Sequence, residues 1–271
     1  MLVRFLVILL FLGANSCDLH KKLTKTDKDD PELPLTGDGP AKGAVRVAFI
    51  GDSGLGSGFA SVLELIKENE AALVIHMGDL GYNESDPSSP TEWNQKIDNI
   101  LGPNFPYLYA IGNHDVRYWY DGTPIGYGEL LAQRIDAIPN LTCTSEGVRR
   151  NVGVKTHCLF QGLFFVLSGI GTKGDGHEEY LDRTLGLHSD TPWKVCVWHK
   201  NQRQMQVGYK SDETGWGVYK TCQKWGAMVA TGHEHSYSRS LTLTDIGSEQ
   251  HGATGMMDAV YLGPNKTFVF V

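Results

Sequence analysis

Short apolar runs alternate with stretches of helical periodicity over the first half of the chain. The runs at 45–50, 71–77 and 107–112 are rich in β-branched and other apolar residues and predict buried strands. Between them, residues 59–70 and 89–101 carry apolar side chains at three- and four-residue spacing, which predicts amphipathic helices. Strand, turn and helix repeated in this order are typical of a mostly parallel sheet with crossover helices.

The pattern changes in the second half of the chain. Residues 147–169 predict an antiparallel hairpin with its turn at Gln161-Gly162. The last two apolar stretches, 258–263 and 267–271, predict short antiparallel strands. Between the hairpin and these strands, the pattern predicts a helix at 177–185, a strand at 193–198, a helix at 215–225 and a strand at 227–232.

Residues 1–16 have the features of a secretory signal peptide. Arg4 precedes an apolar run that is shorter than the about 20 residues needed to cross a bilayer. Ala14 and Ser16 fit a signal-peptidase site, and cleavage there would leave Cys17 as the first residue. Because this junction is also a loose version of a bacterial lipoprotein site, two alternatives stay open: a secreted protein, and one attached to a membrane by a lipid on Cys17.

Residues 17–43 are charged, contain Pro and Gly, and predict a flexible tether. No break in composition divides residues 44–271, which we therefore expect to form one catalytic domain. The net charge is −7, and no basic block or stripe is present, which argues against a nucleic-acid partner. The sequence does not indicate an oligomeric state.

The cysteines fit an oxidising compartment. With Cys17 set aside, Cys143, Cys158, Cys196 and Cys222 can form two disulfides. Of the three connectivities, we favour the sequence-local pairs Cys143–Cys158 and Cys196–Cys222. Four free buried thiols are the alternative.

Side chains that can bind a metal follow the predicted strands, at the point where each strand ends. In α/β sheets, ligands bind beyond the carboxyl ends of strands, so we expect these side chains to meet. Hard oxygen donors and imidazoles without a thiolate argue against a structural cysteine-type zinc site. The set is too large for one transition metal and suits two metals that share a carboxylate. Its members are Asp52, Asp79, Tyr82, Asn113, His199, His233 and His235.

The motifs that carry these residues resemble those of the purple acid phosphatases, which belong to the calcineurin-like metallophosphoesterase superfamily. Most of that superfamily has a histidine ligand at the position of Gly54, whereas the purple branch uses a tyrosinate at the position of Tyr82. The resemblance implies an α/β fold, the metallophosphoesterase four-layer sandwich of two mixed β-sheets flanked by helices, in the small single-domain type. The motifs are GDSG (51–54), GDLGY (78–82), GNHD (112–115), VCVWH (195–199) and GHEH (232–235).

The resemblance also implies how two metal ions would be held. Asp79 would bridge them. Iron(III) would be bound by Asp52, Asp79, Tyr82 and His235, and a second metal, Fe(II), Zn or Mn, by Asp79, Asn113, His199 and His233.

His114 and Asp115 are the candidate catalytic residues. His114 follows a predicted ligand and is expected to face the substrate, as a general acid or as a cationic clamp on phosphate. Asp115 is expected to orient His114. The alternatives are a loop residue that supports the ligands for His114 and a turn cap for Asp115.

The sequence departs from the family pattern around the fourth motif. Cys196 stands at a position that is usually valine, and no further histidine follows His199 in the next residues. Lys200 or Arg203 could bind phosphate instead, although a solvated loop is the default interpretation. Residues 118–120 are either an aromatic rim or a packed loop. His76 is interpreted as strand packing, His157 and His188 as surface residues, and His177 as at most a rim residue.

These features together predict an exported dinuclear-metal acid phosphatase that hydrolyses small phosphomonoesters by attack of metal-bound hydroxide. The first alternative is a generic calcineurin-like phosphodiesterase or phosphatase that uses Mn or Zn without the tyrosinate. The second is a metal-dependent binding protein without catalytic activity.

Overall fold

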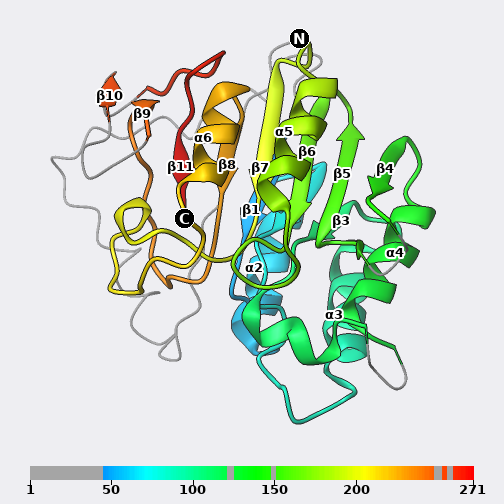
Figure 1. The fold of residues 1–271 in the computed structure, drawn as a ribbon. Coiled ribbons are helices and arrows are strands. Elements are labelled where there is room, and N and C mark those ends of the chain that lie inside the picture. The colour runs from blue at the N-terminus through cyan, green and yellow to red at the C-terminus, as the bar shows by residue number, and fades with distance from the viewer. Residues whose placement is uncertain (1–44, 121–124, 148–150, 247–251, 255–258) are drawn as a thin grey trace, which may run out of the picture.

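The computed structural model describes residues 45–120, 125–147, 151–246, 252–254 and 259–271 (Figure 1). The expected signal peptide, Cys17 and the tether lie outside the described residues. Within the described ranges, the helices are too short or too polar for any of them to span a bilayer.

The smaller sheet confirms the strand–helix repeat of the first half. Its strand order is β1-β2-β3, and both neighbouring pairs are parallel. Crossover helices connect the strands, as the periodicity predicted. The elements are β1 (Val47–Ile50), α2 (Ser57–Glu68), β2 (Leu73–His76), α3 (Ser89–Leu101) and β3 (Tyr107–Tyr109).

The larger sheet is mixed, with the strand order β11-β8-β7-β6-β5-β4. Its β5–β6 pair is the predicted hairpin, and Gln161 and Gly162 form the turn with φ of 48° and 83°. Two consecutive positive φ values are what the twist of a two-residue hairpin requires. The strands are β4 (Leu141–Ser145), β5 (Lys155–Phe160), β6 (Leu163–Ser168), β7 (Trp193–Val197), β8 (Met228–Ala230) and β11 (Val269–Phe270).

Alternate residues of β6 show how the layers are stacked. Phe165 and Leu167 pack in the cluster that contains the smaller sheet, whereas Phe164 and Val166 pack with the helices of the opposite side. Those helices, α5 (His177–Leu187) and α6 (Gly217–Lys224), lie over one face of the larger sheet in Figure 1. The fold is therefore two sheets flanked by helices, as the resemblance implied, although the described strands of the smaller sheet are all parallel and only the larger sheet is mixed.

Helix α4 (Tyr127–Ala137) and strand β4 were not predicted. The helix packs on β3 and α3. Strand β4 lies at the sheet edge, and its residues alternate between half-buried and exposed. Because one edge of β4 faces solvent, its sequence is mostly polar. The pattern of apolar residues therefore gives little indication of a strand there.

The C-terminal strands need correction. Strand β11 pairs with β8 in parallel, and its antiparallel partners are only single bridges, such as Arg239 with Phe270. In the described part of 258–263, the single bridge of Gly263 with Lys266 replaces the predicted strand. A small antiparallel pair forms earlier instead, from β9 (Thr242–Asp245) and β10 (Gly252–Thr254).

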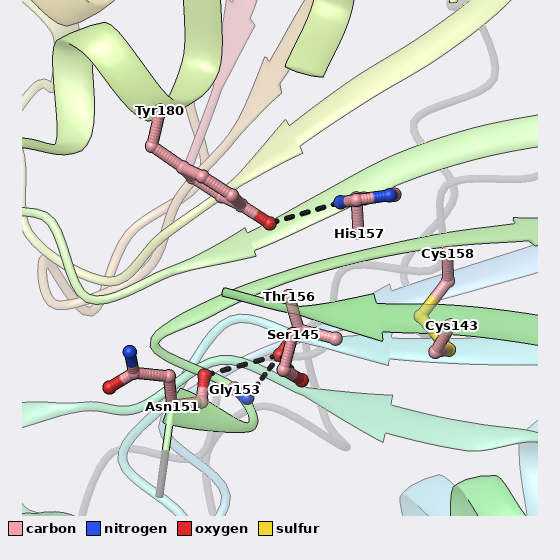
Figure 2. Close-up of a disulfide and its surroundings, with 8 residues drawn as sticks. All are labelled: Cys143, Ser145, Asn151, Gly153, Thr156, His157, Cys158 and Tyr180. Atoms are coloured by element: carbon pink, nitrogen blue, oxygen red, sulfur yellow. Dashed lines mark hydrogen bonds between the residues drawn. A yellow bond between two sulfur atoms is a disulfide. The ribbon is translucent and has the colours of Figure 1, made fainter. Parts of the chain in front are cut away.

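One of the two predicted disulfides is present. Cys143 and Cys158 are bonded and join β4 to β5, as Figure 2 shows. Cys196 and Cys222 are buried free thiols whose sulfurs lie 2.6 Å apart. The predicted partners are thus neighbours, but the prediction of a bond between them is wrong for this structure.

Candidate metal centre

The predicted ligands sit in turns of unusual backbone conformation. Asp52, Asp79, Tyr82 and His233 have φ between 54° and 70° without being glycine. Such values are uncommon, above all for large side chains, and are often found where a functional site constrains the backbone. Each of these turns follows a strand and directs a side chain to the carboxyl edges of the sheets.

Tyr82, Asp52 and His235 form the more open part of the centre. The Tyr82 hydroxyl donates to Oδ1 of Asp52 at 2.9 Å and lies 2.9 Å from Nε2 of His235. Nε2 of His235 lies 3.2 Å from the same Asp52 oxygen. A carboxylate, a phenol and an imidazole therefore converge on one point, with Tyr82 36% exposed.

Gly54 lies beside the ring of Tyr82. A Cβ atom at residue 54 would lie 3.7 Å from Cδ2 of Tyr82. A side chain at this position would therefore lie against the tyrosine ring. The position of the absent histidine and the added tyrosine are therefore neighbours, and the link between them stays a prediction.

Asp79, His199 and His233 form the more buried part. Their ligand atoms lie within 4.8 Å of one another, and this is the only group of three or more such residues that meets this distance among those the structure describes. Nε2 of His199 lies 3.0 Å from Oδ2 of Asp79. Nδ1 of His199 lies 2.9 Å from the Met77 carbonyl oxygen, to which it donates, so Nε2 faces the centre.

The charges of this centre attract cations. Burial opposes protonation of His199, but the carboxylates of Asp79 and Asp52 outweigh it and raise its pKa to about 9. Burial and the neighbouring His199 lower the pKa of His233 to about 4. Burial and the Asp52 carboxylate raise the pKa of Tyr82, which keeps its phenol protonated until a cation binds.

Unpartnered polar atoms test whether the centre fits metal ions. Oδ1 of Asn113 and Nδ1 of His233 are buried and make no hydrogen bond. Nε2 of His199 is also buried and lies 3.0 Å from Oδ2 of Asp79. Buried polar atoms rarely lack a partner, and each such case calls for an explanation. All three belong to the predicted ligand set, and an oxygen with two imidazole nitrogens is a suitable donor set for a divalent transition metal. The residues present therefore fit metal binding.

His114 lies beside the centre and remains accessible. Its backbone N–H donates to Oδ1 of Asp79 at 2.9 Å, and its ring centroid is 4.7 Å from that of Tyr82. Nδ1 of its ring is paired with Oε1 of Glu84. The side chain is 38% exposed, so the other ring nitrogen can meet a ligand at the mouth of the centre.

Asp115 has a different role from the one expected. Its Oδ2 accepts from the backbone N–H groups of Asp79 and Gly112 at 2.9 and 2.8 Å, and its Oδ1 accepts from that of Leu80 at 2.8 Å. Both oxygens are thus committed to backbone amides, which joins the second and third motif loops. This corrects the expectation that Asp115 orients the His114 ring, since Glu84 takes that place.

His76 contacts residues of the first two motif loops through both of its ring nitrogens. It is fully buried, its Nδ1 accepts from the N–H of Gly78 at 3.2 Å, and its Nε2 lies 3.0 Å from Oγ of Ser53. Trp93 also donates to that Ser53 oxygen at 3.2 Å. The interpretation of His76 as a packing residue is confirmed.

The other candidates near the site mostly pack. Trp119 is fully buried and its indole N–H donates to Val152, so the packed-loop alternative holds for it. His177 is buried against Ser168. Lys200 is paired with Glu213 rather than free for phosphate.

Sequence reasoning missed two carboxylates, Glu84 and Glu213. Glu84 pairs with His114, and Oε2 of Glu213 lies 3.0 Å from Nε2 of His233. Glu84 is close enough to Tyr82 in the sequence to have been considered. No sequence signal connects Glu213 to His233.

A mixed α/β sandwich with carboxylates and histidines at the carboxyl ends of its strands defines the metallophosphoesterase class. The chain belongs to the calcineurin-like phosphoesterase family, whose family model matches residues 45–237. That family implies two metal ions. No curated protein sequence matches the chain.

Among solved structures, the chain is similar to the purple acid phosphatase PPD1 from seeds of yellow lupin (Lupinus luteus). The sequences are 19% identical, the TM-score is 0.54, and the match covers 82% of this chain. It covers 43% of the lupin chain, so this chain corresponds to less than half of that protein. At this identity the similarity establishes the fold.

Proposed function

We propose that the protein is an exported acid phosphatase that uses two metal ions to hydrolyse small phosphomonoesters. Iron(III) would be held by Asp52, Asp79, Tyr82 and His235, and Fe(II), Zn or Mn by Asp79, Asn113, His199 and His233. The convergence of the Tyr82 hydroxyl, Asp52 and His235 at 2.9–3.2 Å is the observation that carries this proposal. A phenolate and carboxylates are the anionic oxygen ligands that a hard trivalent ion prefers.

The metal ions, when bound, would polarise the phosphate and lower the pKa of water in the site. The side chains of the protein would position the substrate and supply a proton. The accessible ring of His114 would hold a phosphate oxygen or give a proton to the leaving oxygen. Glu84 would keep that ring in place through Nδ1, which leaves Nε2 directed to the site, 3.9 Å from Oδ2 of Asp79.

Asp115 serves the reaction indirectly in this proposal. By accepting three backbone N–H groups, it fixes the loop that carries Asp79 against the loop that carries Asn113. Ligands from different strands then keep one spacing before any metal binds. Such preorganisation is what a two-metal site requires.

A second candidate function is supported by the state of the tyrosine. Burial and Asp52 raise the pKa of Tyr82, so a cation of lower charge than iron(III) would leave the side chain as a neutral phenol. The protein would then be a phosphatase or phosphodiesterase that uses Mn or Zn, without tyrosinate ligation. This alternative keeps the same fold and the same His114.

Substrate choice separates the two functions. The metal-loaded protein should hydrolyse p-nitrophenyl phosphate with a higher kcat/KM than bis(p-nitrophenyl) phosphate, and it should do so at acid pH. A preference for the diester, or activity confined to neutral and alkaline pH with Mn or Zn, would favour the second candidate. Hydrolysis of neither ester would contradict both.

Export is a separate part of the proposal. It rests on residues 1–16 as a signal peptide and 17–43 as a tether, with a lipid on Cys17 as the alternative to free secretion. Residues 44–271 would be the catalytic domain. Mass spectrometry of the exported protein would show the first residue and any lipid on it.

A further inference from the structure

The two ring nitrogens of His233 have different surroundings. Nε2 lies 3.0 Å from Oε2 of Glu213. Nδ1 is buried and makes no hydrogen bond. The ring is thus held on one side through Nε2, and one of its nitrogens lies within 4.8 Å of the ligand atoms of Asp79 and His199.

This arrangement determines which nitrogen can bind a metal. An ionised carboxylate only accepts hydrogen bonds, so the neutral His233 ring carries its proton on Nε2 and its lone pair on Nδ1. His199 has the opposite arrangement, because its Nδ1 donates to the Met77 carbonyl and its Nε2 lies 3.0 Å from Oδ2 of Asp79. The two histidines therefore offer different nitrogens to the same centre.

We propose that Glu213 is a positioning residue that presents His233 to the second metal through Nδ1 and thereby sets the affinity of that site. This inference rests on the proposed two-metal function and adds a residue to it. A carboxylate that accepts from the remote nitrogen fixes the ring and makes it a stronger ligand than a neutral acceptor would. Glu213 itself touches neither metal nor substrate.

The loop around Glu213 is built to hold this carboxylate. Its other oxygen is paired with Lys200, which follows the ligand His199. Its backbone N–H donates to the Asn201 carbonyl at 3.1 Å, and Nδ2 of Asn201 donates to the Gly232 carbonyl at 2.7 Å. These contacts connect the Glu213 loop to the residues that follow His199 and, through Asn201, to the residue that precedes His233. The Glu213 side chain is only 22% exposed.

A zinc titration of three variants tests the proposal. Glu213→Ala removes both the acceptor and its charge, whereas Glu213→Gln keeps an acceptor oxygen but no charge. We expect Glu213→Ala to weaken the binding of one of two zinc ions roughly 10- to 100-fold, the effect typical of such outer partners, with Glu213→Gln between it and the wild type. The other zinc ion should bind as before.

Asp212→Asn is the matched control. Asp212 lies next to Glu213 on the same loop, and its Oδ1 accepts from the N–H of Arg203 at 2.8 Å. An asparagine oxygen can still accept this bond, so the variant removes one charge without touching His233. It should bind both zinc ions like the wild type, and all metal-free variants should show the same Tm.

The outcomes separate this inference from the proposed function. If the wild type binds two zinc ions and Glu213→Ala binds both equally tightly, the inference is overturned and the two-metal function stands. If the wild type binds fewer than two, both fall. Nitrogen-15 NMR of the zinc-loaded protein gives a readout independent of affinity: zinc on Nδ1 of His233 supports the inference, and zinc on Nε2 overturns it.

Discussion

At the scale of single residues, His114 shows how the side chain proposed to be catalytic is kept in place. Its backbone N–H is fixed on Asp79 and its ring is paired with Glu84. Both side chains of this pair are accessible: 38% of the His114 side chain and 49% of the Glu84 side chain are exposed. The pair therefore contributes to positioning rather than to the stability of the fold.

Replacing Glu84 tests this role. In Glu84→Ala, the His114 ring loses its partner at Nδ1, so we expect kcat to fall about tenfold with KM little changed. Glu84→Gln, which keeps an acceptor oxygen, should recover part of this loss. Steady-state kinetics with p-nitrophenyl phosphate measures both. An unchanged kcat in Glu84→Ala would show that the pairing is irrelevant to catalysis.

His76 predicts a pH dependence of stability. Burial lowers its pKa from 6.5 to about 3, so the folded state excludes a proton that the unfolded state binds. The stabilising effect is fully present above pH 6.5 and is lost as the pH falls towards 3. From pH 7 to pH 5, the loss is about 2 kcal/mol in the metal-free protein.

Urea unfolding of the metal-free wild type and of His76→Gln at pH 7 and pH 5 measures this loss. The variant should be less stable at pH 7, because it loses the bonds to Ser53 and Gly78, and should change less between the two pH values. Equal pH dependence in both proteins would show that His76 does not titrate in this way.

Sequence alone identified the candidate ligands better than the residues that support them. The order of the motifs placed Asp79, His199 and His233 at strand ends, where the structure brings them together. Glu84 and Glu213 were missed because their histidine partners lie on other loops. Such contacts depend on how turns pack, which no local pattern encodes.

At the scale of elements, the loops after β2 and β3 meet at a place without room for a side chain. A Cβ atom on Gly112 would lie 2.1 Å from the backbone nitrogen of Asp79 and 2.2 Å from its Oδ1. The glycine of the third motif therefore allows two loops to approach closely enough for Asp115 to bind both.

Gly112→Ala should separate these loops. We expect a loss of about 1–3 kcal/mol in the free energy of unfolding and weaker metal binding, because the added methyl overlaps backbone atoms. Gly56→Ala is the control, since nothing lies within 4 Å of its added Cβ. It should change stability by less than about 1 kcal/mol. Chemical denaturation and a zinc titration compare the two, and equal behaviour would contradict the account.

Elements with a strong internal pattern were predicted, and those defined by their neighbours were not. Helix α2 and the β5–β6 hairpin carry their signal in their own residues. The direction of β11 depends on β8, which is distant in the sequence, so an apolar run could not reveal it. Strand β4 is an edge strand held partly by a disulfide, which weakens its dependence on strand propensity.

At the scale of the whole molecule, Cys143–Cys158 ties the edge of the larger sheet to its interior. The two cysteines are 15 residues apart, so their bond restricts the unfolded chain and stabilises the fold by about 3 kcal/mol. Cys143→Ala combined with Cys158→Ala should lower the Tm. Replacing Cys196 and Cys222 with alanine should remove no disulfide bond, because both cysteines are free in this structure. Thermal unfolding with and without a reductant distinguishes the pairs, and a Tm insensitive to loss of Cys143 and Cys158 would contradict this account.

The proposed acid phosphatase function depends most on Tyr82 as a ligand of iron(III). The visible absorption spectrum of the iron-loaded protein tests it most directly, with Tyr82→Phe as the comparison. The account predicts a broad charge-transfer band and a purple or pink colour in the wild type, absent from Tyr82→Phe although both bind iron. A colourless wild type with confirmed two-metal occupancy would contradict it and favour the Mn- or Zn-dependent phosphoesterase.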